Sequence, residues 1–115
     1  MSRKTRKRIT AKPKAKARVF AAFGDKTRLA LIARLCSGEP ASISQLADDS
    51  KLTRQAITKH LGVLERAGIV SSAQSGRERL FSFEPDPLED LQQYLASVSK
   101  QWNQRSARRK SHAEK

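Results

Sequence analysis

Apolar residues recur every three or four positions along most of the chain, and in one short stretch the spacing changes to that of strands. The helical spacing predicts five helices, and the short stretch predicts two strands joined by a turn at Ser75-Gly76. The expected helices cover about 14–23, 26–37, 43–49, 54–67 and 87–104, and the expected strands about 69–74 and 79–84. This order, α-α-α-α-β-β-α, describes a mainly α fold with one small β-hairpin.

Helix-starting residues stand before four of these helices. Asp25, Ser42, Thr53 and Asp86 each have a short polar side chain that can accept a hydrogen bond from a free N–H group in the first helical turn. Gln45 follows Ser42 at the spacing of a capping box. The caps therefore set the helix starts independently of the apolar spacing.

The helices at 43–49 and 54–67 are separated by a turn at Lys51-Leu52 and are followed directly by the predicted hairpin. A short helix, a tight turn and a longer helix form a helix-turn-helix, in which the second helix enters the major groove of DNA. A hairpin directly after that helix corresponds to the wing of a winged helix-turn-helix. The order of elements therefore predicts a DNA-binding fold.

Two of the helices have a clear apolar stripe. The expected buried residues are Leu29, Ile32, Leu35 and Cys36 in helix 26–37, and Ile57, Leu61 and Leu64 in helix 54–67. We interpret Cys36 as a small core residue, and the alternative is a thiol switch.

The face of helix 54–67 opposite its apolar stripe is polar and includes Arg54, Gln55, Thr58 and Lys59. Arg and Gln side chains can make paired hydrogen bonds with guanine and adenine edges. We expect Arg54 and Gln55 to read bases, Thr58 to contact a base, a thymine methyl group or a phosphate, and Lys59 to contact phosphate. The simpler alternative is a solvated polar face; the turn, the caps and the wing favour DNA.

Three further residues extend this predicted DNA-binding site. Arg77 and Arg79 flank or follow the glycine of the hairpin turn, where we expect them to contact phosphates or an adjacent minor groove. His60 follows Lys59 and can be a hydrogen-bonding helix residue, a phosphate contact or a metal ligand. Because Cys36 and His112 are the only other Cys or His residues, we expect no metal site.

The last helix carries a narrow apolar stripe at alternating steps of three and four residues, which is the a/d spacing of a coiled coil. We predict a homodimer interface on this stripe, completed by the first helix. The alternative is a helix that lies on its own domain. The predicted interface residues are Phe20, Phe23, Leu88, Leu91, Leu95, Val98 and Trp102.

The net charge of +13 comes from the two ends of the chain. Residues 1–18 contain nine Lys or Arg and no acid, residues 105–115 contain five basic residues and one acid, and residues 19–104 contain ten of each sign. We therefore expect a disordered basic tail over 1–13, a domain over 14–104 and a basic tail over 105–115. Such tails bind polyanions without any fold, so the charge alone does not identify a DNA-reading protein.

Composition and motifs argue against other classes. No apolar run is long enough to cross a bilayer, and one cysteine excludes an internal disulfide, which fits a reducing compartment. The chain has no Gly-rich phosphate loop and no nucleophile–His–acid grouping. We expect no enzymatic activity and no cofactor.

Residues 19–91 resemble the ArsR/SmtB family of bacterial winged-helix repressors, most specifically in FGDKTRLALIARL, TRQAITKHLGVLERAGIV and SGRERLFSF. The resemblance implies a homodimer held by the first and last helices, an operator near the gene's own promoter and release by an inducer. Metal-sensing members carry Cys-x-Cys-Asp where this chain has Ser42, Ser44 and Gln45. Where other members place Asp, His and Glu ligands on the last helix, this chain has Glu89, Asp90, Gln92 and Gln93. The chain therefore looks more like the metal-independent branch.

Together these features predict a cytoplasmic, nucleoid-associated homodimer that binds double-stranded operator DNA as an inverted repeat. It would repress its own or a neighbouring operon; the sequence names no small-molecule inducer. Two alternatives stay open at this point: a winged-helix module for protein interaction, and a non-specific basic protein that binds nucleic acid.

Overall fold

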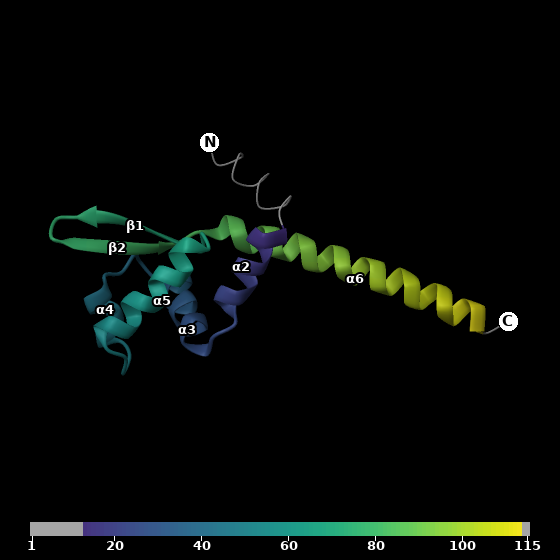
Figure 1. Cartoon of the computed structure of the whole chain (residues 1–115), viewed down its shortest axis with the longest axis horizontal. Helices are drawn as coiled ribbons and strands as arrows, with labels where there is room; N and C mark the ends of the chain where they lie inside the picture. The colour runs from purple at the N-terminus through teal and green to yellow at the C-terminus, as the bar shows by residue number, and fades with distance from the viewer. Residues whose placement is uncertain (1–12, 114–115) are drawn as a thin grey trace.

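The computed structural model describes residues 13–113, with side chains to Arg109. The elements follow the predicted order, which confirms the mainly helical winged helix-turn-helix (Figure 1). They are α2 (Pro13–Phe23), α3 (Lys26–Ser37), α4 (Ile43–Asp48), α5 (Arg54–Arg66), β1 (Val70–Ser75), β2 (Glu78–Phe83) and α6 (Pro85–Ala113). The predicted disorder of residues 1–12 lies outside the described residues.

Three of the four predicted caps are present. The Asp25 carboxylate accepts from Arg28 N at 3.0 Å, and Thr53 Oγ1 accepts from Ala56 N at 3.1 Å. Ser42 and Gln45 form the complete capping box at the start of α4, with hydrogen bonds of 3.2 and 2.9 Å. The short helix of the helix-turn-helix is thereby fixed at its first turn.

The start of α6 differs from the prediction. The helix begins at Pro85, so Asp86 lies in its first turn and is not the N-cap. Proline fits the first helical position because its φ is already helical and that position needs no N–H group. Two prolines, Pro85 and Pro87, were available, and the chain uses the earlier one.

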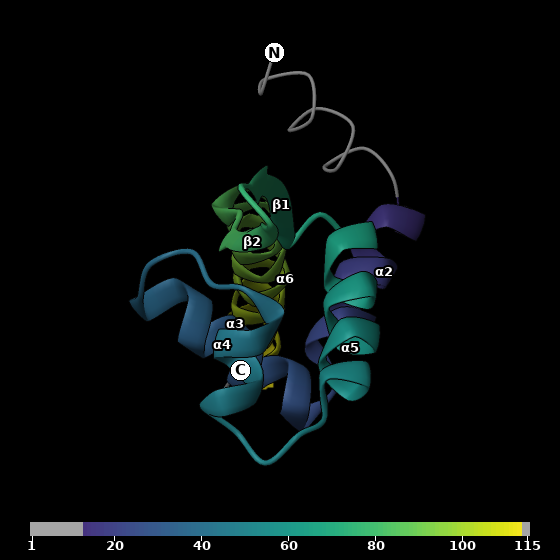
Figure 2. The ribbon, with the colours of Figure 1, turned by 90° about the vertical axis from the view of Figure 1, so that its left-hand side faces the viewer.

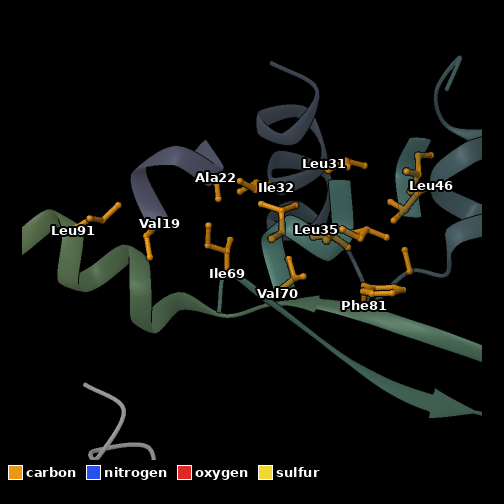
Figure 3. Close-up of a cluster of buried hydrophobic side chains, with 14 residues drawn as sticks. Val19, Ala22, Leu31, Ile32, Leu35, Leu46, Ile69, Val70, Phe81 and Leu91 are labelled. Carbon is orange, nitrogen blue, oxygen red and sulfur yellow. The ribbon is translucent and has the colours of Figure 1, made fainter. Parts of the chain in front are cut away.

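The core lies where α2, α3, α5 and the base of the hairpin meet (Figure 3). Its most completely buried large side chains are Leu46, Ile57, Leu61, Leu64, Ile69 and Val70. The predicted stripe of α5 is therefore correct. Burial of each such side chain contributes roughly 1.5–3 kcal/mol.

The predicted stripe of α3 is wrong at two positions. Leu29 is 48% exposed and Cys36 is exposed, whereas Leu31 is buried together with Ile32 and Leu35. The inward face of α3 thus begins at Arg28, whose guanidinium group hydrogen-bonds to the end of α2. The predicted stripe did not include Arg28 and was displaced by one residue, which placed Leu29 and Cys36 inside.

The hairpin pairs Val70 with Phe83 at its base and Ser75 with Glu78 at its tip. Gly76 has φ +63° at the first central position of the turn, and Arg77 at the second central position does not have a positive φ. This combination matches a type II′ turn, which is common in two-residue hairpins. Ala41 and Phe81 exchange two backbone hydrogen bonds of 3.0 and 2.8 Å. This bridge ties the segment before α4 to the wing.

The last helix is the longest element and leaves the body of the protein after Leu91 (Figure 1). Leu91 is buried, but every residue from Gln92 to Arg109 except the half-buried Ser106 is exposed. Figure 2, which looks along α6, shows the other elements grouped at its near end. The predicted end near Gln104 is wrong, because 105–113 continues the helix; this segment contains no glycine or proline to stop it.

Candidate nucleic-acid interface

Both ends of α5 are fixed by local hydrogen bonds. Thr53 caps its start, and at its end Gly68, with φ +79°, donates to Glu65 O while Ile69 N donates to Leu64 O. This pair of hydrogen bonds is a Schellman motif, which requires the left-handed conformation that glycine adopts most easily. The motif sends the chain directly into the wing, so the recognition helix and the wing have a fixed relation.

The four polar residues of α5 predicted to contact DNA lie together on the helix. Arg54, Gln55, Thr58 and Lys59 are all exposed, on the side of the helix away from Ile57, Leu61 and Leu64. Successive residues of a helix are rotated by about 100°, which brings these four onto one arc. The first two turns of α5 therefore present two forked or planar polar groups, one hydroxyl and one ammonium group on one exposed arc.

Thr58 has a restricted role within this arc. Its hydroxyl donates a 2.7 Å hydrogen bond to Arg54 O, four residues earlier in the same helix. The hydroxyl proton is thereby used, and a phosphate, which only accepts hydrogen bonds, has no donor to bind there. Of the three expected contacts of Thr58, the geometry favours its methyl group against a thymine methyl group.

The two wing arginines are placed differently. Arg77 is exposed at the tip of the hairpin, next to Gly76. Arg79 instead turns across the hairpin, where its Nη1 donates to Ser72 Oγ at 2.9 Å, and Ser72 Oγ donates to Glu65 of α5 at 2.9 Å. Arg77 is therefore exposed at the hairpin tip, whereas Arg79 links the wing to α5 through Ser72.

His60 lies apart from the other predicted DNA-binding residues. It is half-buried on the edge of α5 that faces α3, and its Nδ1 lies 3.3 Å from Arg28 Nη1 and 3.9 Å from Asp25 Oδ2. Sequence reasoning missed Arg28 altogether. The available signal was its position in line with Leu31, Ile32 and Leu35 on α3.

Asp25, which lies beside His60, has a pKa that differs from the ordinary value of a carboxyl group. The pKa of the Asp25 carboxyl is lowered, chiefly because the backbone N–H of Arg28 donates to the carboxylate; partial burial opposes this, and the charge of Arg28 supports it. Asp25 therefore acts as a charged cap for α3 down to unusually acidic conditions.

The predicted dimer residues divide into two groups. Leu91 is 4% exposed and belongs to the core of its own chain, and Phe23 packs partly against that core. Leu88 is half-buried. The exposed group consists of Phe20, Leu95, Val98 and Trp102, together with Tyr94, which the sequence reading did not include.

The exposed group has local order. The rings of Phe20 and Tyr94 meet edge to face with centroids 6.2 Å apart, and Lys16 Nζ lies 5.6 Å from the centre of the Tyr94 ring. These contacts join α2 to α6 across a groove of about 340 Å³. We define the apolar strip as Phe20, Tyr94, Leu95, Val98 and Trp102.

Two of the positions compared above with the Cys-x-Cys-Asp motif have another role in this chain. Ser42 and Gln45 both take part in the capping box of α4. Among the described residues, no three His, Cys, Asp or Glu side chains lie close enough together to hold a metal ion. Nor does any described helix combine the length and the apolar character needed to cross a membrane.

Comparison with known proteins agrees with this geometry. Residues 23–73 match a family model described as a helix-turn-helix domain. The chain is 38% identical over 79 residues to the HTH-type transcriptional regulator YuzN of Bacillus subtilis, covering 64% of this chain and 86% of the relative. It is 35% identical over 74 residues to the HTH-type transcriptional regulator Rv2034 of Mycobacterium tuberculosis, covering 64% and 68% respectively.

A solved structure extends the likeness to most of the fold. An ArsR-like transcriptional regulator from Rhodococcus sp. RHA1 superposes with a TM-score of 0.83 at 35% identity, covering 88% of this chain and 92% of the other. These relatives are described as helix-turn-helix or ArsR-like transcriptional regulators. With the capped helix-turn-helix and its wing, these matches show that the chain belongs to the ArsR family of winged helix-turn-helix transcriptional regulators.

Proposed function

We propose that this regulator is a homodimeric repressor that reads an inverted-repeat operator in its own or a neighbouring promoter. The observation that carries this proposal is the exposed arc on the first turns of α5, beside a wing whose tip presents Arg77. Each copy would place α5 in a major groove, with half-sites about one helical turn, roughly 34–36 Å, apart.

Within that arc the roles follow from side-chain chemistry. Arg54 and Gln55 have the paired donors and acceptors that discriminate guanine and adenine edges. Lys59 and Arg77 supply charge for phosphates, which positions the protein without sequence preference. Arg79 and His60 would act indirectly, because both are held by other protein groups.

A second copy is the proposed occupant of the apolar strip. Trp102 is 58% exposed and Leu95 is 48% exposed, although large apolar side chains gain most from burial. The charges of α6 are also unevenly distributed: the half-buried Asp86 and the exposed Glu89 lie near its start, and Arg105 and Arg108 lie in its second half. An antiparallel partner helix would bring unlike charges together at both ends, which favours a two-fold symmetric pair.

We further propose that repression does not depend on a metal ion. The donor side chains that metal-sensing relatives use are replaced by Ser42 and Gln45, which serve the capping box. The protein would act in the cytoplasm on chromosomal DNA, and a released state would require a signal of another chemical class.

The base-reading role can be tested with a series of operator duplexes in which single base pairs are changed. Gln55→Ala should lose discrimination at one position in each half-site, by roughly 1–3 kcal/mol. Arg77→Ala, the matched control, should weaken binding to all duplexes alike and reduce the salt dependence of binding by about one ion. If Gln55→Ala leaves the preference for every base pair intact, the proposed placement of α5 is wrong.

The basic N-terminal residues provide a second control. A chain that begins at Pro13 keeps every described helix but lacks six of the nine basic residues of the segment 1–18. We expect it to bind DNA more weakly at low salt and to retain the same preferred sequence. Loss of sequence preference together with affinity would favour a non-specific nucleic-acid-binding protein.

A further inference from the structure

We propose that Arg28 and His60 are positioning residues for DNA reading, because their contact sets the orientation of α5 relative to α2. This inference rests on the proposed function, in which α5 reads DNA and α2 lies at the interface between two copies. It concerns residues that neither enter the DNA-facing arc nor belong to the apolar strip.

Arg28 connects three elements from its place in the first turn of α3. Its Nε donates to Ala22 O at 2.8 Å and its Nη2 donates to Ala21 O at 3.2 Å. These carbonyl groups belong to the last turn of α2, where Ala21 O also accepts from the backbone N–H of Gly24 at 3.0 Å. The third nitrogen, Nη1, reaches His60 of α5 at 3.3 Å. A single planar group therefore joins the end of α2 to the side of α5.

The chemistry of the contact defines its direction. A guanidinium group has five donors and no acceptor, so His60 Nδ1 must accept the hydrogen bond. The imidazole then carries its proton on Nε2. Asp25 holds Arg28 in place, since its carboxylate accepts a hydrogen bond from the backbone N–H of Arg28 at 3.0 Å. The ring is therefore held in one tautomer and one orientation.

The contact between Arg28 and His60 restricts rotation of α5 about its own axis, which the apolar core restricts only weakly. Ile57, Leu61 and Leu64 fix the depth of the helix, but apolar contacts are non-directional and resist rotation about the helix axis weakly. A hydrogen bond to a planar, charged donor fixes an angle. His60 lies five residues from Gln55, about 7.5 Å along the helix, so a small rotation at His60 displaces the reading residues.

The other end of the connection faces the second copy. The edge-to-face contact of Phe20 and Tyr94 attaches α2 to α6 at the apolar strip, where the partner is proposed to bind. From Phe20, α2 leads within one turn to Ala21 and Ala22, the two residues whose carbonyl groups Arg28 binds. The path from partner surface to recognition helix thus consists of one helix end, one guanidinium group and one imidazole ring. It determines how two α5 helices are spaced across the dimer.

The test uses the full chain and duplexes built from the inverted repeat that the wild-type protein selects, with the spacer between half-sites lengthened or shortened by one base pair. His60→Leu removes the acceptor at similar volume, whereas His60→Gln keeps an acceptor oxygen. We expect His60→Leu to bind the selected operator about tenfold more weakly and to lose preference for the selected spacer. His60→Gln should remain within about twofold of the wild type.

Two further variants separate positioning from stability. Val63→Ala removes partly buried packing from α5 without removing a partner of Arg28, so it should lower Tm and leave the spacer preference unchanged. Arg28→Lys keeps a charge but lacks the planar fork, and its effect should not add to that of His60→Leu in a double-mutant cycle.

The proposal is overturned if His60→Leu keeps the wild-type spacer preference, if His60→Gln is impaired as strongly as His60→Leu, or if Val63→Ala alters spacing to the same extent. A wild-type protein that selects no inverted repeat would instead refute the proposed function, which makes the two failures distinguishable.

Discussion

The helices α5 and α6 have similar apolar spacing and opposite environments. In α5 the stripe of Ile57, Leu61 and Leu64 is at most 1% exposed, whereas in α6 Leu95 and Val98 are 48% and 45% exposed. The difference arises because α5 lies against α3, α4 and the hairpin, and α6 leaves the body after Leu91 (Figure 1). A periodic apolar stripe thus identifies a helix and a contact face, but not whether the contact is made within the chain or by a partner.

The largest effect is expected from a charge placed on the part of the apolar strip that lies on α6, because this would disrupt the proposed dimer interface. Leu95→Glu would bury two like charges at a two-fold interface, so we expect the protein to sediment as a monomer that keeps its helical content. Gln93→Glu, on the opposite side of α6, is the matched control and should leave the mass unchanged. A dimeric Leu95→Glu variant would show that the strip has another role.

Replacing one leucine by alanine in each stripe should distinguish the two environments, because the loss of unfolding free energy should depend on protein concentration in α6 only. Leu64→Ala creates a cavity in the core of one chain and should lower the free energy of unfolding by about 2–5 kcal/mol at any protein concentration. Leu95→Ala should lower it only at concentrations where the dimer forms. Denaturant unfolding at several protein concentrations measures both, and equal concentration dependence for the two variants would contradict the assignment.

Much of the helix-turn-helix could be predicted because its caps and apolar spacing depend on residues close together in the sequence. The caps of α3, α4 and α5 and the stripe of α5 depend on residues a few positions apart, and they occur as expected. The errors occur where contact with a group distant in the sequence decides which side of a helix is buried. Leu29 and Cys36 were placed inside because a buried side of α3 that begins with Arg28 can be recognised only once the end of α2 is seen beside it.

The same limit applies to the candidate site. Arg54, Gln55, Thr58 and Lys59 share one helical arc, which periodicity predicts directly. His60 and Arg79 were grouped with them by sequence neighbourhood, but Arg28 and Ser72 hold their side chains elsewhere. Leu91 likewise continues the spacing of α6 and yet belongs to the core of its own chain. Spacing gives the face of a helix and leaves open what lies against it.

The capping box of α4 allows a test, with a smaller expected effect, of how much this helix start stabilises the fold. Ser42→Ala removes the acceptor for Gln45 N and should lower the free energy of unfolding by about 0.5–2 kcal/mol. Ser44→Ala changes a neighbouring hydroxyl outside the box and should stay within about 0.5 kcal/mol of the wild type. Thermal unfolding distinguishes them, and equal losses would mean that the box does not stabilise α4.

Asp25 should give the smallest effect, visible only as a dependence on pH. Because its pKa is lower in the folded protein, its charge stabilises the fold above the unfolded pKa of about 3.8, and this contribution is lost as the pH falls through the folded value. Asp25→Asn retains a capping side chain without the charge. The Tm difference between the two proteins should therefore be present at pH 6 and shrink below about pH 4. A difference that is constant across this range would exclude the charge as its cause.

The most direct test of the central claim is selection of bound sequences by the full chain from a random duplex DNA pool. If α5 reads DNA and α6 pairs two copies, the selected sequences will contain an inverted repeat whose half-site centres lie about one helical turn apart. Selection of a single unrepeated half-site would contradict the pairing through α6. Recovery of no preferred sequence would contradict the reading role of α5.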